Sequence, residues 1–187
     1  KAFPGASPST TLAPPIRSLC VWNVNPVVSI PNQQRIIKGL MRDDLLTIVH
    51  DLVVTETAKY ADYVFPATSQ IESLDLVPAW GHHYLSLNQP AIAPVGESVC
   101  NTEFFRRLAA ALGLRESFLF ESDESLIQTA LSSGHPWLEG ITFDRLREVG
   151  SIRFHHDRDW RPFANGGFRT PSGKAELWSE SMKQQGL

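Results

Sequence analysis

The strongest constraint on the fold is a segment in which one apolar run ends in two polar residues and a second apolar run follows after a short turn. Residues 45–51 are mostly apolar and end in His50 and Asp51, and the next apolar run, 63–65, stops at Pro66. Polar groups at the carboxyl end of a buried strand are where open α/β sheets bind ligands. The segment therefore predicts a strand, a turn that faces a ligand, and a second strand.

Apolar runs and helical periodicities around this segment predict an α/β fold. Residues 17–23 predict a strand that ends before Asn25, and residues 32–42 carry apolar side chains at helical spacing. Strands that alternate with helices in this way indicate βαβ units, so we expect a Rossmann-like parallel sheet with flanking helices. The other predicted elements are a loop over 75–83, an edge strand or extended arm over 84–89, and helices over 101–112, capped by Asn101, 122–133 and 142–149.

Changes of composition along the chain predict three parts. Residues 1–16 are rich in Pro, Ser, Thr and Ala and are expected to be a linker. Residues 17–150 contain the predicted strands and helices and form the expected Rossmann-like domain. Residues 151–187 are more polar and are expected to be a linker that leads into another domain. The sequence as a whole is interpreted as a piece of a longer protein.

Composition and charge exclude several function classes. A net charge of −3 over 187 residues gives no basic surface, so nucleic acid is not an expected partner. No apolar run reaches the roughly 18 residues that a membrane helix needs, so direct membrane insertion is not expected either. Cys20 and Cys100 form no CxxC motif and indicate no disulfide framework.

Asp51 and Asn25 are the first candidate ligand groups, and each has an alternative structural interpretation. The Asp51 carboxylate could accept two parallel donors, such as those of a guanine base or a ribose diol, or it could cap the residues that follow. The Asn25 amide could contact a phosphate or a base, or it could serve as a turn residue before Pro26. The residue pattern alone favours the structural interpretation at both positions.

Other binding motifs are weak in this sequence. No G-x-G-x-x-G motif follows the first predicted strand, so the usual pyrophosphate loop of a nicotinamide-binding domain is missing. The adjacent histidines at 82–83 and 155–156 have no Cys, Asp or Glu cluster at ligand spacing, which favours solvated loop histidines over a metal site.

Several strings, taken together, resemble the molybdopterin oxidoreductase family, of the dimethyl-sulfoxide-reductase type that carries bis-molybdopterin guanine dinucleotide. The second string below, with TETA, then AD, then a proline and a downstream glutamate, is highly specific. The strings occur in the order of the family and cover nearly all of the chain from Arg17. They are VWNVNP (21–26), HDLVVTETAKYADYVFPATSQIE (50–72), NQPAIAPVGESVCNTEFFRRLAAALG (88–113) and FRTPSGKAELWSE (168–180).

The resemblance implies a fold, a cofactor and a set of site residues. In such enzymes this region is the third of four domains, a Rossmann-like unit that grips one guanosine of the cofactor, and the TPSGK string leads into a fourth, β-barrel domain. Asn101 stands where many relatives have an aspartate that contacts the nucleotide, and His50 replaces a small residue of some relatives. The cofactor-binding residues that the resemblance implies are Asn25, His50, Asp51, Ser73 and Asn101.

The resemblance also implies the chemistry of the intact enzyme, which would be a two-electron redox reaction or oxygen-atom transfer. The cofactor would carry molybdenum or tungsten, and a [4Fe–4S] cluster is expected in the full-length protein. The string matches include neither the cluster cysteines nor the metal ligand, so no catalytic and no metal-binding residue is expected in this chain, and the fragment alone is expected to be inactive. The expected partners are the remaining domains of the same chain and electron-transfer subunits.

Two alternatives remain open from the sequence. One is a metal-free structural iron–sulfur subunit of the respiratory complex I type, which would keep the fold and lose the metal. The other is a stand-alone α/β binding module.

Overall fold

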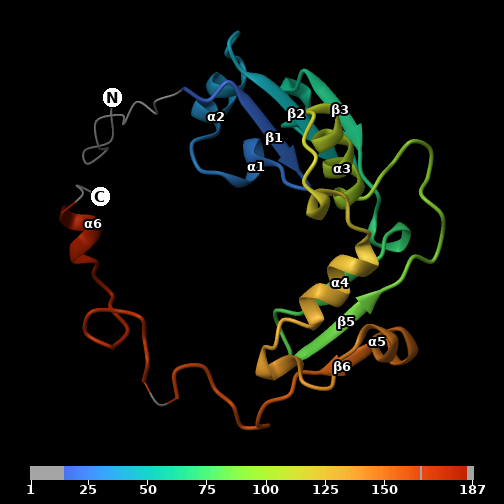
Figure 1. Cartoon of the computed structure of the whole chain (residues 1–187). Helices are drawn as coiled ribbons and strands as arrows, with labels where there is room; N and C mark the ends of the chain where they lie inside the picture. The colour runs from blue at the N-terminus through green and yellow to red at the C-terminus, as the bar shows by residue number, and fades with distance from the viewer. Residues whose placement is uncertain (1–14, 165, 185–187) are drawn as a thin grey trace. The chain divides into compact units, whose positions relative to one another are not determined.

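A computed structural model describes residues 15–164 and 166–184 of the chain. The residues from Arg17 to His155 form one compact unit, and the described residues from His156 onward belong to a second unit. The compact unit contains two three-stranded sheets (Figure 1). No helix in the described residues is long and apolar enough to cross a membrane.

The first sheet is parallel and confirms the three strands that the apolar runs predict. It consists of β1 (Ser18–Trp22), β2 (Leu46–Asp51) and β3 (Tyr63–Pro66), in the order β1-β2-β3. The connection from β1 to β2 contains the helices α1 (Pro26–Ser29) and α2 (Gln33–Leu40), whereas β2 and β3 are joined by a single 3-10 turn, η1 (Ala58–Tyr60). Because all three strands run the same way, their carboxyl ends lie at one edge of the sheet.

The two faces of this sheet are covered by different elements. On one face Val21, Val49 and Ala58 form a small buried core. The other face is covered by α3 (Asn101–Ala111), which packs two phenylalanines against a row of rings that runs across the strands. Trp22, His50 and Phe65 are paired in register across β1, β2 and β3 and form that row, which contacts Phe104 and Phe105.

The second sheet is antiparallel and was not predicted. Its strands are β4 (Asp75–Pro78), β5 (Tyr84–Asn88) and β6 (Ser151–Arg153), with β5 in the centre. The expected loop over 75–83 therefore contains a strand, and the expected edge strand over 84–89 is a central one. The strand over 84–89 is thus confirmed, but its central position was not expected, because β6 comes from more than 60 residues further along the chain and such long-range pairing leaves no local sequence signal. The predicted loop was wrong at residues 75–78, which pair with the nearby strand β5.

The larger hydrophobic core lies between this second sheet and two helices. These are α4 (Asp123–Leu131) and α5 (Phe143–Val149), which confirm the helices predicted over 122–133 and 142–149. Their N-caps are Ser122 and Thr142, whose hydroxyls accept hydrogen bonds from backbone N–H groups of the first turn. The buried residues of this core are Leu85, Leu87, Ile127, Leu131, Ile141, Phe143 and Leu146.

The helix α3 confirms the prediction over 101–112, but its cap differs. The N-cap is Cys100, which makes no side-chain capping hydrogen bond, and Asn101 is the first residue inside the helix. Asn101 does not cap because its side-chain oxygen accepts a hydrogen bond from Asn23 instead. The remaining short helical turns are η2 (Gln70–Glu72), η3 (Ser117–Phe120) and η4 (Pro136–Leu138).

The C-terminal part of the chain differs from the expected boundary by a few residues. Residues 151–153 form β6 and pair with β5, so the compact unit extends past the expected end at residue 150. From residue 156 onward, the described residues contain turns and one helix, α6 (Glu180–Gln184), and no strand. The lead-in to a β-barrel domain stays a prediction. Of the predicted linker over 1–16, residues 1–14 lie outside the described residues.

Candidate functional site

A cavity of about 640 Å³ opens at the carboxyl edge of the parallel sheet. It is formed by segments that follow β1, β2 and β3, by the start of β4, and by the first turn of α3. This is the edge at which open α/β sheets bind ligands, and the volume lies in the range of small-molecule sites. The residues that line this strand-end cavity are Asn23, Leu52, Thr68, Ser69, Gln70, Ser73, Leu74, Asp75, Cys100, Asn101 and Thr102.

The lining of the strand-end cavity is polar but carries little charge. It contains amides, hydroxyls and a thiol, a single carboxylate from Asp75, and no lysine or arginine. A pyrophosphate would meet no cationic side chain in this lining, whereas a nucleobase or a ribose would meet many neutral donors and acceptors. The residues therefore fit the neutral nucleoside part of a dinucleotide.

Asn23 joins the end of β1 to the start of α3. Its backbone adopts the left-handed conformation, with a φ of 49°, and its N–H donates to the carbonyl oxygen of His50 at 3.0 Å. Its side-chain Nδ2 donates to Oδ1 of Asn101, also at 3.0 Å. Asparagine is one of the few residues other than glycine that adopts this conformation readily. The turn after β1 therefore places two amide side chains together in the cavity wall.

Glu72 stabilises the segment after β3 that lines the strand-end cavity. Its carboxylate accepts hydrogen bonds from the backbone N–H and the hydroxyl of Ser69, which makes a capping box, and from the N–H of Val95 at 2.7 Å. The bonds from Ser69 and then that from Val95 lower the pKa of Glu72. Glu72 thus fixes Ser69 and Gln70 of the lining and ties them to the loop that returns to α3.

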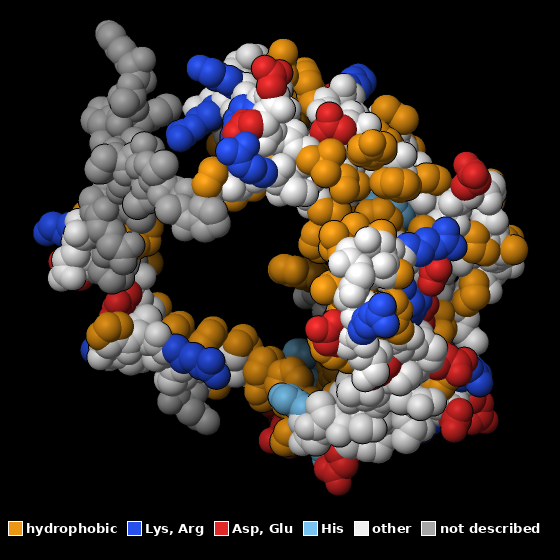
Figure 2. All heavy atoms as spheres, turned by 45° about the horizontal axis from the view of Figure 1, so that its top comes forward, with side chains coloured by type: hydrophobic (Ala, Val, Ile, Leu, Met, Phe, Trp, Pro, Cys, Tyr) orange, Lys and Arg blue, Asp and Glu red, His pale blue; other side chains and the backbone are white. Residues whose placement is uncertain are grey.

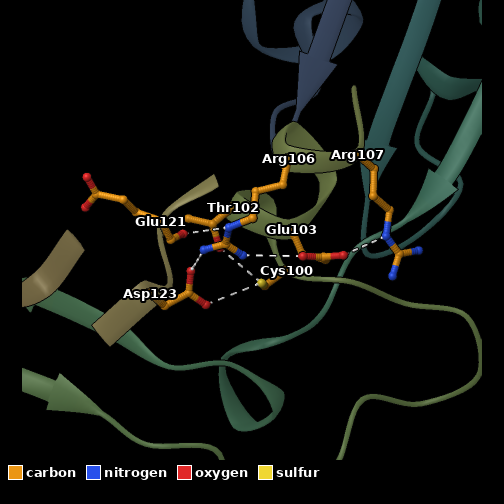
Figure 3. Close-up of polar contacts among 7 residues, drawn as sticks. All are labelled: Cys100, Thr102, Glu103, Arg106, Arg107, Glu121 and Asp123. Atoms are coloured by element: carbon orange, nitrogen blue, oxygen red, sulfur yellow. Dashed lines mark hydrogen bonds and ion pairs between the residues drawn. The ribbon is translucent and has the colours of Figure 1, made fainter. Parts of the chain in front are cut away.

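The start of α3 is held by a cluster of polar residues that connects it to α4 (Figure 3). Arg106 of α3 donates to the carbonyl oxygen of Glu121 at 2.8 Å and to the carboxylate of Asp123 at 2.5 Å. The Cys100 thiol lies 3.7 Å from the other oxygen of that carboxylate. Burial acts to raise the pKa of Asp123, but hydrogen bonds from Thr102 and Arg106 outweigh it and lower the pKa. The cluster fixes the helix turn that lines the cavity.

Of the residues that the sequence predicts as site residues, Ser73 and Asn101 line the strand-end cavity. Ser73 lies between η2 and β4, and its hydroxyl donates to the carbonyl oxygen of Ser69 at 3.2 Å. Asn101 faces the cavity from the first turn of α3 and contacts Asn23. The structure therefore brings together two residues that are 28 positions apart in the sequence.

Asn25 makes structural contacts outside the cavity lining. Its side-chain Oδ1 accepts hydrogen bonds from the N–H of Thr57 at 3.2 Å and from its hydroxyl at 2.7 Å, and its Nδ2 donates to Glu56 at 3.1 Å. Thr57 is fully buried, and its hydroxyl oxygen also accepts from the N–H of Val27. Asn25 thus connects the turn after β1 to the turn after β2.

His50 is fully buried between the sheet and α3, outside the cavity lining. Its ring is stacked on that of Phe104, and neither ring nitrogen makes a hydrogen bond of normal geometry. Burial lowers the pKa of His50, against smaller opposite effects of the Phe65 backbone and the Asp51 carboxylate. The imidazole is therefore neutral and acts as part of the ring stack under α3.

Asp51 ends β2 and is almost fully buried, with 8% of its surface exposed. Its Oδ1 accepts a hydrogen bond from the N–H of Leu52 at 2.8 Å, which is the local loop bond of the structural interpretation. Its neighbour Leu52 lines the cavity, while Asp51 itself does not. Its contact with a guanosine stays a prediction.

Sequence reasoning missed the other polar residues of the cavity. Asn23 carries the same signal as Asn25, an asparagine after a strand end, but only Asn25 was predicted as a site residue. Thr68 and Ser69 follow Pro66 at the end of β3, and Thr102 follows Asn101, so the position after a strand or at a helix start could have identified them. In the part of the chain that the structure describes, no group of three or more His, Cys, Asp or Glu side chains could hold a metal ion.

A second hollow of about 410 Å³ lies between β2, β3 and α3 and is mainly apolar. Its walls include Ile48, Phe65, Phe104 and Leu108. Figure 2 shows hydrophobic side chains gathered on the part of the surface where the parallel sheet and α3 lie. With an apolar lining it offers few groups that could orient a polar ligand, so the strand-end cavity is the better candidate site.

Comparison with known proteins assigns this chain to a family. The family model described as molybdopterin oxidoreductase matches residues 6–111, which is more than half of the chain. The chain is 47% identical over 175 residues to "Probable oxidoreductase YoaE" of Bacillus subtilis, and this match covers 93% of the chain and 25% of YoaE. It is 31% identical to the assimilatory nitrate reductase catalytic subunit of the same organism, over 87% of the chain and 24% of the relative.

A solved structure agrees with this assignment. Acetylene hydratase from Pelobacter acetylenicus matches with a TM-score of 0.66 and 28% sequence identity, over 91% of this chain and 23% of the hydratase chain. The chain thus spans about a quarter of the length of the relatives that it matches. It belongs to the molybdopterin oxidoreductase family, of the dimethyl-sulfoxide-reductase type, and corresponds to part of the larger chains of that family.

Proposed function

We propose that this chain binds the guanosine part of a molybdopterin guanine dinucleotide, and that the strand-end cavity is the place where it does so. The observation that carries the proposal is the cavity itself, at the carboxyl edge of the parallel sheet, with a neutral polar lining that suits a nucleoside. Ser73 and Asn101, which the sequence indicates as cofactor-binding residues, are part of that lining.

The names of the relatives support a role in holding a cofactor rather than in choosing a substrate. One relative is named as a nitrate reductase and a solved one as an acetylene hydratase, which are different reactions on different substrates. A segment that all of them share over most of its length is expected to serve what they have in common. In this family that common part is a molybdopterin cofactor.

The roles of the individual residues follow from their positions in the cavity. Amide and hydroxyl groups of Asn23, Ser73 and Asn101 would orient the nucleoside, and Leu52 would contact one of its flat faces. Glu72 and Arg106 would act behind them by fixing the loop after β3 and the first turn of α3. The bound cofactor would supply redox or oxygen-transfer chemistry at its metal, molybdenum or tungsten, while this chain supplies binding and orientation.

The rest of the proposed protein lies outside this chain. We infer that the longer protein carries the metal-binding residues, a [4Fe–4S] cluster and a β-barrel domain, and that it performs a two-electron redox reaction with electron-transfer subunits as partners. Neither alternative, a metal-free subunit of the complex I type or a stand-alone binding module, gains support from the relatives. The 187-residue chain alone is expected to reduce no S-oxide or N-oxide with a viologen dye.

Cofactor content of the natural protein that contains this chain tests the proposal. We expect acid treatment of the purified protein to release guanine nucleotide together with molybdenum or tungsten. Ser73→Phe fills the strand-end cavity and should remove most of both, whereas Ser133→Phe, at an exposed site outside the cavity lining, should leave them unchanged. Protein without guanine nucleotide, or folded Ser73→Phe protein with full cofactor content, would contradict the proposal.

A further inference from the structure

His50 is placed where a proton can enter only at a cost. Its side chain is fully buried between the parallel sheet and α3, and neither ring nitrogen makes a hydrogen bond of normal geometry. Its ring is stacked on that of Phe104, with 4.3 Å between the ring centroids. A charged imidazolium would bring two N–H donors and a net charge into this position without an acceptor, which is strongly unfavourable. The stack therefore excludes the protonated form of His50.

Uncharged side chains surround His50 within the sheet. Trp22 on β1 and Phe65 on β3 are its partners in the strand register. Cys20 and Tyr63 lie two residues before these partners and point to the same face of the sheet. A thiol and a phenol carry no charge in neutral or mildly acidic solution, and burial raises the pKa of the Cys20 thiol further. The two neighbouring strands therefore offer no counter-charge to a protonated His50.

The charges near His50 favour its protonation less than burial opposes it. Burial lowers the pKa of His50, and the smaller opposite effects of the Phe65 backbone and the Asp51 carboxylate do not compensate. Glu97 lines the apolar hollow together with Phe104. The charged residues of α3 bond one another or the residues at the start of α4, and they are Glu103, Arg106 and Arg107.

Phe104 connects the stack to the strand-end cavity. It lies one helical turn after Cys100, and its backbone N–H donates to the Cys100 carbonyl oxygen at 2.9 Å. The wall of the cavity on this side consists of Cys100, Asn101 and Thr102. An open hollow of about 410 Å³ separates α3 from β2 and β3 next to the stack, so the helix is not packed on the sheet along its whole length. A change at the stack therefore acts on the cavity wall.

We propose that His50 is a proton-controlled latch for the strand-end cavity: the neutral ring keeps α3 docked and the cavity formed, and protonation releases the helix and, with it, a bound ligand. The helix movement stands on the stack alone, whereas the identity of the ligand rests on the guanosine-binding role proposed above. The proton comes from solvent and binds a ring nitrogen of the released imidazole. The ratio of released to docked helix should rise as the pH falls below 6.5, by at most about tenfold per pH unit.

Amide hydrogen exchange of the 187-residue chain tests the release of α3 without any ligand. Protection factors, corrected for the intrinsic pH dependence of exchange, should fall about fivefold or more for α3 between pH 7.0 and 5.5. Those of α4, which packs in the other core, should stay within about twofold. His50→Phe keeps a ring in the stack and His50→Gln is neutral at every pH, so both should make the protection of α3 independent of pH.

His82→Phe provides the matched control, because His82 lies at the surface. This variant should show the same loss of α3 protection as the wild-type chain. A loss that is equal in α3 and α4 would report global unfolding instead of helix release. A loss that persists in folded His50→Phe and His50→Gln chains would assign the proton to another group. Either result would overturn the latch.

Guanosine, which has no phosphate to titrate, tests the link between the latch and the cavity. Its affinity for the wild-type chain, measured by ligand-detected NMR, should fall about threefold or more between pH 7.0 and 5.5, and should not change in His50→Phe. Saturating guanosine should restore the protection of α3 at pH 5.5, because a ligand favours the state that it binds. An affinity that is independent of pH while α3 is released would overturn the link. Failure of the folded chain to bind guanosine at any pH would instead count against the proposed guanosine site, and hydrogen exchange would still decide the role of His50 in docking α3.

Discussion

The buried imidazole of His50 is stacked on the ring of Phe104, with the ring centroids 4.3 Å apart and the planes inclined by 6°. This contact joins the central strand of the parallel sheet to the helix whose first turn lines the strand-end cavity. His50 is fully buried and its nitrogens are not hydrogen-bonded in normal geometry, so the stack depends on a neutral ring. The docking of α3 should therefore respond to pH.

Burial lowers the pKa of His50 in the folded chain below its usual value of 6.5, so the unfolded chain binds a proton more readily than the folded chain. The folded state is then favoured above pH 6.5, and stability should be lost as the pH falls below that value, by at most about 1.4 kcal/mol per pH unit. His50→Phe keeps a ring in the stack and should flatten this part of the profile. Denaturant unfolding between pH 7.5 and 5 measures this pH dependence of the free energy of unfolding in both chains.

An exposed histidine gives the control for this prediction. His82→Phe should leave the pH dependence of the wild-type chain in place, because His82 lies at the surface. An equal pH dependence in His50→Phe and wild type would show that other groups cause the acid loss of stability.

Asn25 should prove to be a structural residue. Asn25→Ala removes the acceptor of both the N–H and the hydroxyl of Thr57, which is fully buried, and each such loss costs about 1–3 kcal/mol. We expect a lower free energy of unfolding in urea and an unchanged nucleotide affinity per folded chain. Gln34→Ala, at an exposed site on α2, should change neither. Loss of nucleotide binding by a stably folded Asn25→Ala chain would instead assign Asn25 to the cofactor.

The Arg106 cluster should stabilise the chain more than the neighbouring ion pair. Arg106 is largely buried, and Arg106→Ala removes the donor of the Glu121 carbonyl oxygen and the cationic partner of the Asp123 carboxylate, at an expected cost of about 1–3 kcal/mol. Arg107 is exposed and pairs with Glu103, so Arg107→Ala should cost about 0–1 kcal/mol. Thermal unfolding of the two variants gives the comparison. Equal effects would mean that the contacts between α3 and α4 contribute little.

Asp51 can be tested by separating its charge from its local hydrogen bond. Asp51→Asn keeps an oxygen that can accept from the Leu52 N–H, so the fold should be retained. If the carboxylate binds the guanosine, as the family resemblance implies, cofactor content of the natural protein should fall severalfold in this variant. Unchanged cofactor content in Asp51→Asn, together with a stability loss of more than about 2 kcal/mol in Asp51→Ala, would assign Asp51 to the loop alone.

The parallel sheet and the helices were predictable because their signals are local. The apolar runs of β1, β2 and β3 and the caps Ser122 and Thr142 lie within a few residues of the elements they define. In the second sheet the strand over 84–89 was predictable, but its pairing with β6 was not, because Ser86 pairs with Ser151 and no nearby residue indicates that contact.

The candidate site depended on a different signal. Ser73 and Asn101 were selected through the family resemblance; both lie in the cavity wall, and their contact with a cofactor stays a prediction. Asn23 and Asn25 could not be told apart from sequence, since both are asparagines after a strand. What separates them is the left-handed turn at Asn23, which directs its side chain to Asn101, while Asn25 contacts Thr57.

Amide chemical shifts can locate the binding site of guanosine monophosphate on the chain. We expect the largest shifts on residues of the strand-end cavity, among them Asn23, Thr68, Ser73 and Asn101. The core under α4 and α5, with Ile127 as its reporter, should not respond. Shifts centred on the apolar hollow between β3 and α3, or no shifts at saturating nucleotide, would contradict guanosine binding in the strand-end cavity.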